Sequence, residues 1–460
     1  MTDTTLQLED ATIDVDGTAP AAWSATTWFA VVSLAATSFA LVSAEFLPAG
    51  LLTPMARDLG ISEGTAGQVV TATASIGAVT AMLSNVLIGR LNRKTVLVGL
   101  MALAVASNVL AALAPNFWLL LVGRAGLGIA LSAFWALSVA VVARLVGANA
   151  TGRGMAIVTL GVSLATIAAP SMGALISDWL GWRSAMAMTA GLAVVAMLLQ
   201  LLSLPSLPAT ASNSLADVLR LTRRRGIQLG MLAILLLMTG HFAGSVYVRP
   251  FLEHVTLLAT GPIALALLGF GIAAVIGNIA GGCMADANIH VALVVTAALM
   301  AFAALALVLW GVHIGVAFGF ATLWGFAFGM APVVLPTNLS RAAPDALEAA
   351  GSLMVASFQV AITIGAVVGG YAVDTYGPTA PLTVTAILAA STAVLALLQP
   401  RNQTLPPLTQ QPECDPDNIA DALHKFTQCA RCLLPQSKAK DARLRPLEGE
   451  RRSSRALLRR

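Results

Sequence analysis

Long hydrophobic runs alternate with short polar segments along most of the chain. Each run has roughly the 20 apolar residues that a helix needs to cross the hydrocarbon core of a bilayer. A segment inside lipid must also satisfy its own backbone polar groups, which a helix does by itself. The pattern predicts spans at residues 27–50, 64–88, 95–114, 118–142, 155–177, 184–203, 227–250, 262–284, 290–311, 314–336, 351–373 and 379–398. We therefore expect an all-α membrane protein with twelve transmembrane helices.

The polar segments divide this series into two sets of six. The longest polar interruption before the tail is 204–226, which is rich in proline and serine and then becomes basic. We predict five parts: an N-terminal tail (1–25), a six-helix bundle (26–203), a linker (204–226), a second six-helix bundle (227–400) and a basic, disordered tail (401–460). Two parallel six-helix halves with a site between them are a known transporter architecture.

Basic residues gather in alternate loops. With both termini inside the cell, the outer loops carry only Arg57, Arg183 and Arg249. The inner loops carry ten basic residues: Arg90, Arg93, Lys94, Arg144, Arg153, Arg220, Arg223, Arg224, Arg225 and Arg341. Ten against three agrees with the positive-inside rule, so we expect both termini to be cytoplasmic.

Two patterns recur at an offset of 196 residues. Glu45 lies in the first span with Pro54 nine residues later, and His241 lies in the seventh with Pro250 nine residues later. A second group follows the same offset: Gly173, Asp178 and Gly181 recur as Gly369, Asp374 and Gly377. The repeat predicts a duplicated half, with two ionisable groups at matching depths.

Glu45 is the first candidate for proton chemistry. A charged residue at the centre of a membrane helix costs about 2.5–3.5 kcal/mol on insertion scales, so it persists only when it is paired, protonated or in contact with water. A carboxylate that gains and loses a proton there could couple transport to a proton gradient. The alternative is a side chain near the outer interface that extends to water.

Arg124 and His241 are the other two candidates for proton coupling. Arg124 lies about six residues, roughly 9 Å, below the outer end of its span, at a depth comparable to that of Glu45. It could exchange an ion pair with Glu45 as protons bind, or form a fixed ion pair that only holds the first half together. His241 could relay a proton or be an ordinary packing residue.

Five polar or aromatic residues inside the spans are weaker candidates for contacting a substrate. Aromatic rings stack on flat ligands, and an amide can bond to their edges. These residues are Phe134, Trp135, Phe242, Tyr247 and Gln359. We expect no cofactor and no metal site, since the Cys429–Cys432 pair lacks the four recognisably spaced ligands that structural zinc requires.

Composition and charge limit the classes of function. The chain has 460 residues, is 57% hydrophobic and only 10% charged, whereas soluble domains carry about 25% charged residues. Although the net charge is +4, residues 1–400 have 14 basic and 15 acidic residues, so the excess lies in the tail. We therefore expect the lipid bilayer, protons and a small molecule as partners, no nucleic acid, and a monomer. No arrangement typical of an enzyme appears inside the spans.

Several segments resemble the major facilitator superfamily, in particular its bacterial drug:proton antiporter-1 group, over about residues 25–400. The segment from Glu45 to Ser62 is similar to the first-span signature of that group, and Gly123–Gly128 is similar to its fourth-span motif. Residues 134–138 and 203–208 are similar to the nucleoside exporters of the group. The resemblance implies a role of Arg124 in proton coupling.

The loop motif of the superfamily is incomplete here. Between the second and third spans the basic residues Arg90, Arg93 and Lys94 remain, but the usual aspartate is missing. In the second half Asp286 keeps the acid without the basic end. The resemblance therefore identifies these four residues as a candidate cytoplasmic gating motif.

The resemblance implies a proton-coupled antiporter of the bacterial inner membrane that exports purine ribonucleosides by alternating access. The first alternative keeps the fold and changes the cargo to sugars or hydrophobic drugs. A remote alternative is a transporter-like sensor that signals through the basic tail.

Overall fold

The computed structural model describes residues 23–88, 91–147, 150–208 and 220–399, and all their regular structure is helical. The first group of helices is α1 (Ala25–Phe46), α2 (Pro48–Leu59), α3 (Glu63–Ile88), α4 (Arg93–Ala112), α5 (Phe117–Val146), α6 (Thr151–Leu180) and α7 (Trp182–Ser203). The second is α9 (Arg225–Ser245), α10 (Val248–His254), α11 (Thr260–Ala287), α12 (Ile289–Trp310), α13 (Ile314–Arg341), α14 (Leu347–Tyr376) and α15 (Ala380–Leu398). The predicted N-terminal tail up to residue 22 and the predicted tail beyond residue 399 lie outside the described residues, together with the Cys429–Cys432 pair.

Twelve of these helices are long and apolar enough to cross a membrane, which confirms the predicted all-α fold with twelve spans. The remaining two, α2 and α10, are short and were not predicted. The predicted spans 27–50 and 227–250 were too long, because α1 ends at Phe46 and α9 ends at Ser245. Pro48 occupies the first turn of α2, a position where a missing N–H is tolerated and a new helix starts easily.

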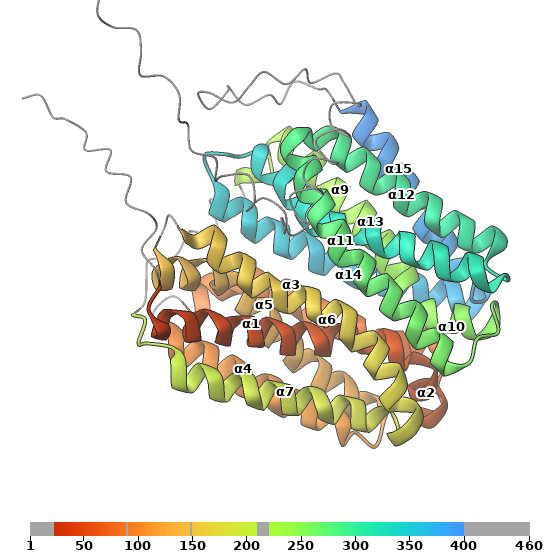
Figure 1. Ribbon diagram of the computed structural model, residues 1–460, viewed down its shortest axis with the longest axis horizontal. Coiled ribbons are helices and arrows are strands. Elements are labelled where there is room, and N and C mark those ends of the chain that lie inside the picture. The colour runs from red at the N-terminus through yellow and green to blue at the C-terminus, as the bar shows by residue number, and fades with distance from the viewer. Residues whose placement is uncertain (1–22, 89–90, 148–149, 209–219, 400–460) are drawn as a thin grey trace, which may run out of the picture.

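The helices form two bundles, α1 to α7 and α9 to α15, which lie one above the other in Figure 1. The bundles meet mainly where α3 packs against α14 and where α6 packs against α11. The short helices α2 and α10 lie together at one end of the molecule (Figure 1). We call this the α10 end, and the opposite end, where residues 204–208 leave α7, the linker end.

Glycines allow close packing of helices inside each bundle. A methyl group at Gly128 of α5 would overlap the backbone of Thr73 in α3, and one at Gly277 of α11 would overlap the backbone of Phe326 in α13. Where lipid gives no hydrophobic driving force, such close approach is a main source of helix association.

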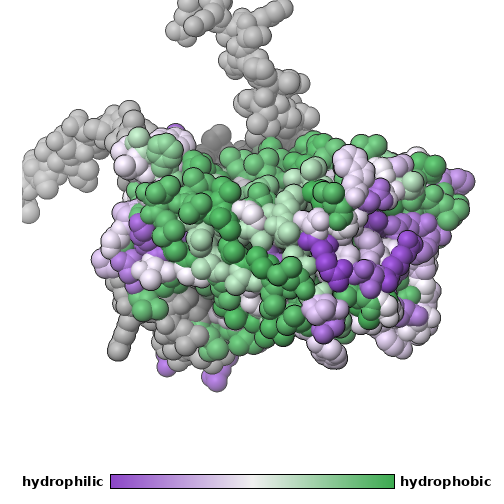
Figure 2. Space-filling model, turned by 90° about the horizontal axis from the view of Figure 1, so that it is seen from below, coloured by the Kyte–Doolittle hydropathy of each residue, from purple (hydrophilic) through white to green (hydrophobic). Residues whose placement is uncertain are grey.

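Hydrophobic side chains also cover the outside of the molecule. Residues such as Phe29, Leu160, Leu202 and Leu398 are more than half exposed. In Figure 2 hydrophobic residues cover most of the middle of one face, and hydrophilic residues gather toward its two ends. A surface of this kind is stable against lipid and would be costly in water.

Candidate functional site

A cavity lies between the two bundles, and the pair of ionisable residues from the sequence repeat lines it. Glu45 reaches it from the last turn of α1, and His241 reaches it from the last turns of α9. Thr166 and Pro170 of α6 line another part of the wall. The repeat therefore brings one carboxyl and one imidazole group from equivalent positions of the two bundles to a single space.

Aromatic rings make up much of the remaining wall. Phe46 and Phe242 lie on opposite bundles with ring centroids 6.3 Å apart and planes inclined by 22°. Phe270 and Trp324 line the wall from α11 and α13. A cavity lined by several aromatic rings is suited to a planar ligand, because stacking of aromatic groups adds binding free energy to that of burial.

His241 is held among these rings. Its ring stacks on Phe328 with a centroid distance of 3.9 Å and an angle of 4°. The Trp324 ring is inclined to it by 73°, with a centroid distance of 5.6 Å. His241 Nδ1 and Trp324 Nε1 are buried without a hydrogen-bond partner. Buried polar groups are nearly always bonded, so these two atoms are candidates for bonding a ligand or water.

The cavity is small in this conformation, with about 50 Å³ of space available to water. A single water needs roughly 10–15 Å³ measured in this way, so a few waters fit. A ligand with a purine base and a ribose would require the two bundles to move apart.

Arg124 bonds to the backbone beside Glu45. Its Nη1 donates to the carbonyl oxygen of Ala44 at 2.8 Å, and its Nε donates to that of Val69 at 3.4 Å. The Ala44 carbonyl needs a donor because the residue four positions later is Pro48, which has no N–H. The guanidinium therefore completes the hydrogen bonding of the turn that carries Glu45.

Glu45 and Arg124 form no ion pair within 4.0 Å, although their charges interact. Arg124 Nη2 is buried and has no hydrogen-bond partner. The structure therefore places the two residues of the predicted pair as neighbours, joined through the Ala44 carbonyl rather than by direct contact.

The other predicted substrate residues divide into three groups. Phe242 lines the cavity, as described. Phe134 and Trp135 pack against each other in the hydrophobic core of the first bundle. Tyr247 donates from its hydroxyl to the Ala366 carbonyl at 2.8 Å, and Gln359 donates to the Ser132 hydroxyl at 3.0 Å. None of these four lines the cavity.

The predicted gating residues lie at the linker end. The Arg93 backbone N–H donates to the Leu207 carbonyl at 2.8 Å, and Lys94 Nζ donates to the Leu201 carbonyl at 2.9 Å. Asp286 is exposed near the end of α11. Arg90 lies outside the described residues. Arg93 and Lys94 therefore contact the end of α7 and the start of the predicted linker.

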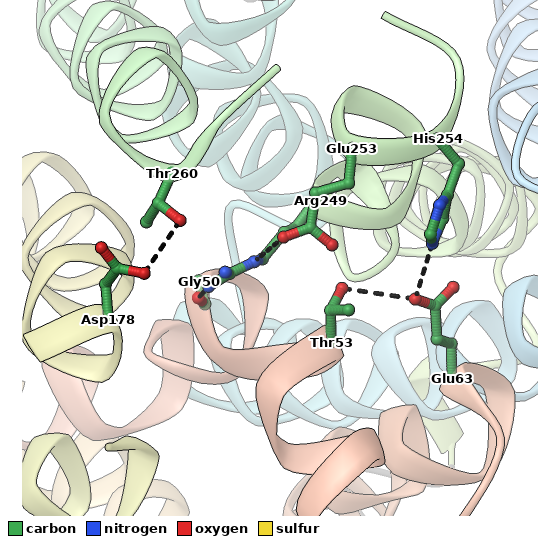
Figure 3. Close-up of polar contacts among 8 residues, drawn as sticks. All are labelled: Gly50, Thr53, Glu63, Asp178, Arg249, Glu253, His254 and Thr260. Atoms are coloured by element: carbon green, nitrogen blue, oxygen red, sulfur yellow. Dashed lines mark hydrogen bonds and ion pairs between the residues drawn. The ribbon is translucent and has the colours of Figure 1, made fainter. Parts of the chain in front are cut away.

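Polar contacts join the two bundles at the α10 end, as Figure 3 shows. Arg249 of α10 donates to the Gly50 carbonyl and pairs with Glu253 at 2.7 Å. His254 lies 3.3 Å from Glu63 of α3. These contacts cover the cavity from this side, so the described conformation is closed at the α10 end.

Trp324, Phe270 and Phe46 line the cavity but were not predicted from the sequence. A signal was present in α13, where Phe320, Trp324 and Phe328 follow one another at intervals of four residues. This spacing places aromatic rings on one face of a helix. Which face points to the cavity required the packing of α13 against its neighbours.

Comparison with known proteins agrees with this architecture. The model of the Major Facilitator Superfamily matches residues 29–354. The purine ribonucleoside efflux pump NepI of Escherichia coli K12 is 38% identical over 368 residues, covering 80% of this chain and 93% of that protein. The protein of the same name from Shigella flexneri has the same identity and coverage.

A solved structure shares the fold. The human organic anion transporter MFSD10 (TETRAN) superposes with a TM-score of 0.58 at 18% identity, covering 80% of this chain and 99% of that one. The twelve spans, the two bundles and the matched family model agree with this fold. The chain belongs to the major facilitator superfamily and is a multi-pass membrane transporter.

Proposed function

We propose that the protein exports purine ribonucleosides across the bacterial inner membrane in exchange for protons. The observation that carries this proposal is the cavity itself, where Glu45 and His241 face a space walled by aromatic rings. A purine base can stack on such rings, and a carboxyl group can carry the proton. The naming of relatives with 38% identity as purine ribonucleoside efflux pumps supports this cargo.

The mechanism follows from unequal binding in two conformations. A proton on Glu45 and a nucleoside in the cavity can drive opposite movements of the bundles only if each binds the two conformations unequally. Arg124 bonds to the carbonyl beside Glu45, so its interaction with that carboxylate would change when Glu45 gains or loses a proton. His241 would bond to the cargo or relay the proton. The distribution of basic loops supports a cytoplasmic linker end and cytoplasmic termini. In that orientation the described conformation is closed to the outside.

The alternative cargo is a hydrophobic drug, and the apolar wall of the cavity favours it. A sugar is less suited to this site, because it would need more hydrogen-bonding groups than the wall offers. The remote alternative is a sensor without transport. It is less favoured, because a sensor would not need the proton-coupling residues Glu45 and Arg124. A monomer would be sufficient, since the cavity is formed by one chain.

The test is uptake of labelled inosine by inside-out vesicles with an acidic interior. We expect accumulation that collapses when the pH gradient is dissipated, and competition by guanosine but not by arabinose. Empty vesicles are the control. If inosine does not accumulate while a hydrophobic dye does, the cargo proposal is wrong and the drug alternative holds.

Trp324→Phe tests the aromatic wall by removing the buried Nε1–H, which has no partner here, while keeping a ring. We expect thermal stability to fall, because Trp324 is fully buried and the smaller ring leaves a cavity in the wall. If that N–H bonds to the cargo, the KM for inosine should rise roughly fivefold, the equivalent of one net hydrogen bond of about 1 kcal/mol.

The matched control for this variant is Trp310→Phe, which changes a tryptophan that is 53% exposed on the outside of the bundle. An unchanged KM in the Trp324 variant would remove the Nε1–H from cargo recognition and leave Trp324 a packing role.

A further inference from the structure

Two aspartates occupy equivalent places at the α10 end. Asp178 lies near the end of α6, and Asp374 lies near the end of α14, 196 residues later. Each side chain reaches across to the other bundle and accepts a hydrogen bond at the start of a helix there. The sequence repeat is therefore also a repeat of contacts between the bundles.

Asp374 makes the more extensive contact. It accepts from the Ser62 hydroxyl at 2.6 Å and from the Gly64 backbone N–H at 2.9 Å, both at the start of α3. Gly64 makes room for this approach, because a methyl group there would overlap the Asp374 carboxylate and the Gly370 carbonyl. The close fit explains a glycine in the first turn of α3.

Asp178 makes the equivalent contact in the opposite direction. It accepts from the hydroxyl of Thr260, the first residue of α11, at 3.2 Å (Figure 3). Thr260 lies 196 residues after Gly64, so both partners of each contact obey the repeat. The pair of contacts thus follows the pseudo-twofold relation of the bundles.

The physical basis is the unsatisfied start of a helix. The first backbone N–H groups of a helix have no partner within it, and an acceptor side chain placed there stabilises the helix. A negative charge is favoured at this end by the helix dipole. At α3 the acceptor for the Gly64 N–H comes from the other bundle, while Ser62 of the same bundle accepts from the Thr65 N–H. At α11 the aspartate of the other bundle accepts from the Thr260 hydroxyl. The stabilisation supplied by the two aspartates exists only while the bundles are closed at the α10 end.

We propose that Asp374 and Asp178 are positioning residues that hold the starts of α3 and α11 from the opposite bundle and so keep the transporter closed at the α10 end. Asp374 does so by capping the Gly64 N–H, and Asp178 by accepting from the Thr260 hydroxyl. The Arg249–Gly50 and His254–Glu63 contacts join the bundles at the same end without following the repeat. The two aspartates are therefore the part of this closure that the duplicated fold itself supplies.

The test measures how often this end opens. Thr53 on α2 is 3% exposed, and α2 contacts α10. In a background with Cys283, Cys414, Cys429 and Cys432 replaced by serine, Thr53→Cys should react with a maleimide at a rate proportional to the open fraction. The measurement uses purified protein in nanodiscs, so it needs neither cargo nor a known orientation.

Asp374→Asn should raise the labelling rate roughly two- to fivefold, the size expected for an exposed charge at a helix start. Asp178→Asn should raise it less, because Asp178 accepts a single, longer bond. The double variant should show the product of the two factors.

Asp58→Asn is the matched control, since Asp58 at the same end bonds to Arg183 and Trp182 within its own bundle. The Arg183 bond lowers the pKa of that carboxyl.

Equal labelling rates in Asp374→Asn and Asp58→Asn would overturn the proposal. If Asp374→Asn does not yield folded protein, Gly64→Ala supplies the second test, because its methyl group displaces both the carboxylate and the Gly370 carbonyl without changing any charge. That variant should raise the labelling rate as well, and an unchanged rate would also contradict the proposal. Failure here would leave the proposed cargo untouched, and failure of inosine transport would leave these contacts untouched.

Discussion

Glu45→Gln is expected to abolish proton-driven inosine accumulation, so that vesicles reach only the outside concentration. Glutamine keeps the size of the side chain and its capacity for hydrogen bonds, but it cannot gain or lose a proton. Exchange of labelled for unlabelled inosine should persist in part, because the aromatic wall of the cavity is unchanged. The measurement is counterflow and gradient-driven uptake in the same vesicle preparation.

Asp58→Asn is the control for the loss of one carboxylate, since Asp58 lies outside the cavity and bonds within the first bundle. Accumulation that survives in Glu45→Gln would place the essential proton elsewhere, with His241 as the next candidate. Loss of both accumulation and exchange, with poor recovery of folded protein, would show instead that Glu45 serves the structure of the first bundle.

Arg124→Met should lower the free energy of unfolding by roughly 1–3 kcal/mol, the cost of one unsatisfied buried carbonyl. The variant keeps the length and burial of the side chain but removes the donor to the Ala44 carbonyl. The Val69 carbonyl still accepts from the Thr73 hydroxyl at 3.0 Å. It also removes a buried cation beside the turn that carries Glu45. Thermal unfolding in detergent, followed by size-exclusion chromatography, measures the change.

A second substitution tests whether the Ala44 carbonyl accounts for this loss. Pro48→Ala supplies the N–H that proline lacks, so the carbonyl can again bond within the chain. The double variant Arg124→Met/Pro48→Ala should recover about 1 kcal/mol relative to the sum of the single changes, as coupled neighbours do. Arg57→Met, at an exposed position on α2, should leave the unfolding temperature unchanged. A double variant without recovery would contradict the carbonyl account.

The sequence predicted the membrane fold well because the relevant physics is local. A run of some 20 apolar residues satisfies its backbone only as a helix in lipid, so the existence of the twelve spans could be predicted directly. The ends were less certain. Breaks at Phe46 and Ser245 depend on short helices that hydrophobicity alone does not separate from the spans.

The candidate site was predictable only where the two halves repeat each other. Glu45 and His241 stand out because ionisable groups are rare in hydrocarbon and because they share one offset. Phe134, Trp135, Tyr247 and Gln359 gave no comparable signal, and the structure places them in packing or in hydrogen bonds between helices.

The sequence by itself determined the spans, the duplication of the halves and the positions of the ionisable residues along each span. The tertiary structure decided which helix faces line the cavity and which carboxylate meets which helix start. Most spans are apolar on every side, so no periodicity marks the face that points inward. Asp178 and Asp374 show the consequence: their recurrence is visible in the chain, but their partners Thr260 and Gly64 lie in the opposite bundle. Only the docking of the two bundles brings these residues together.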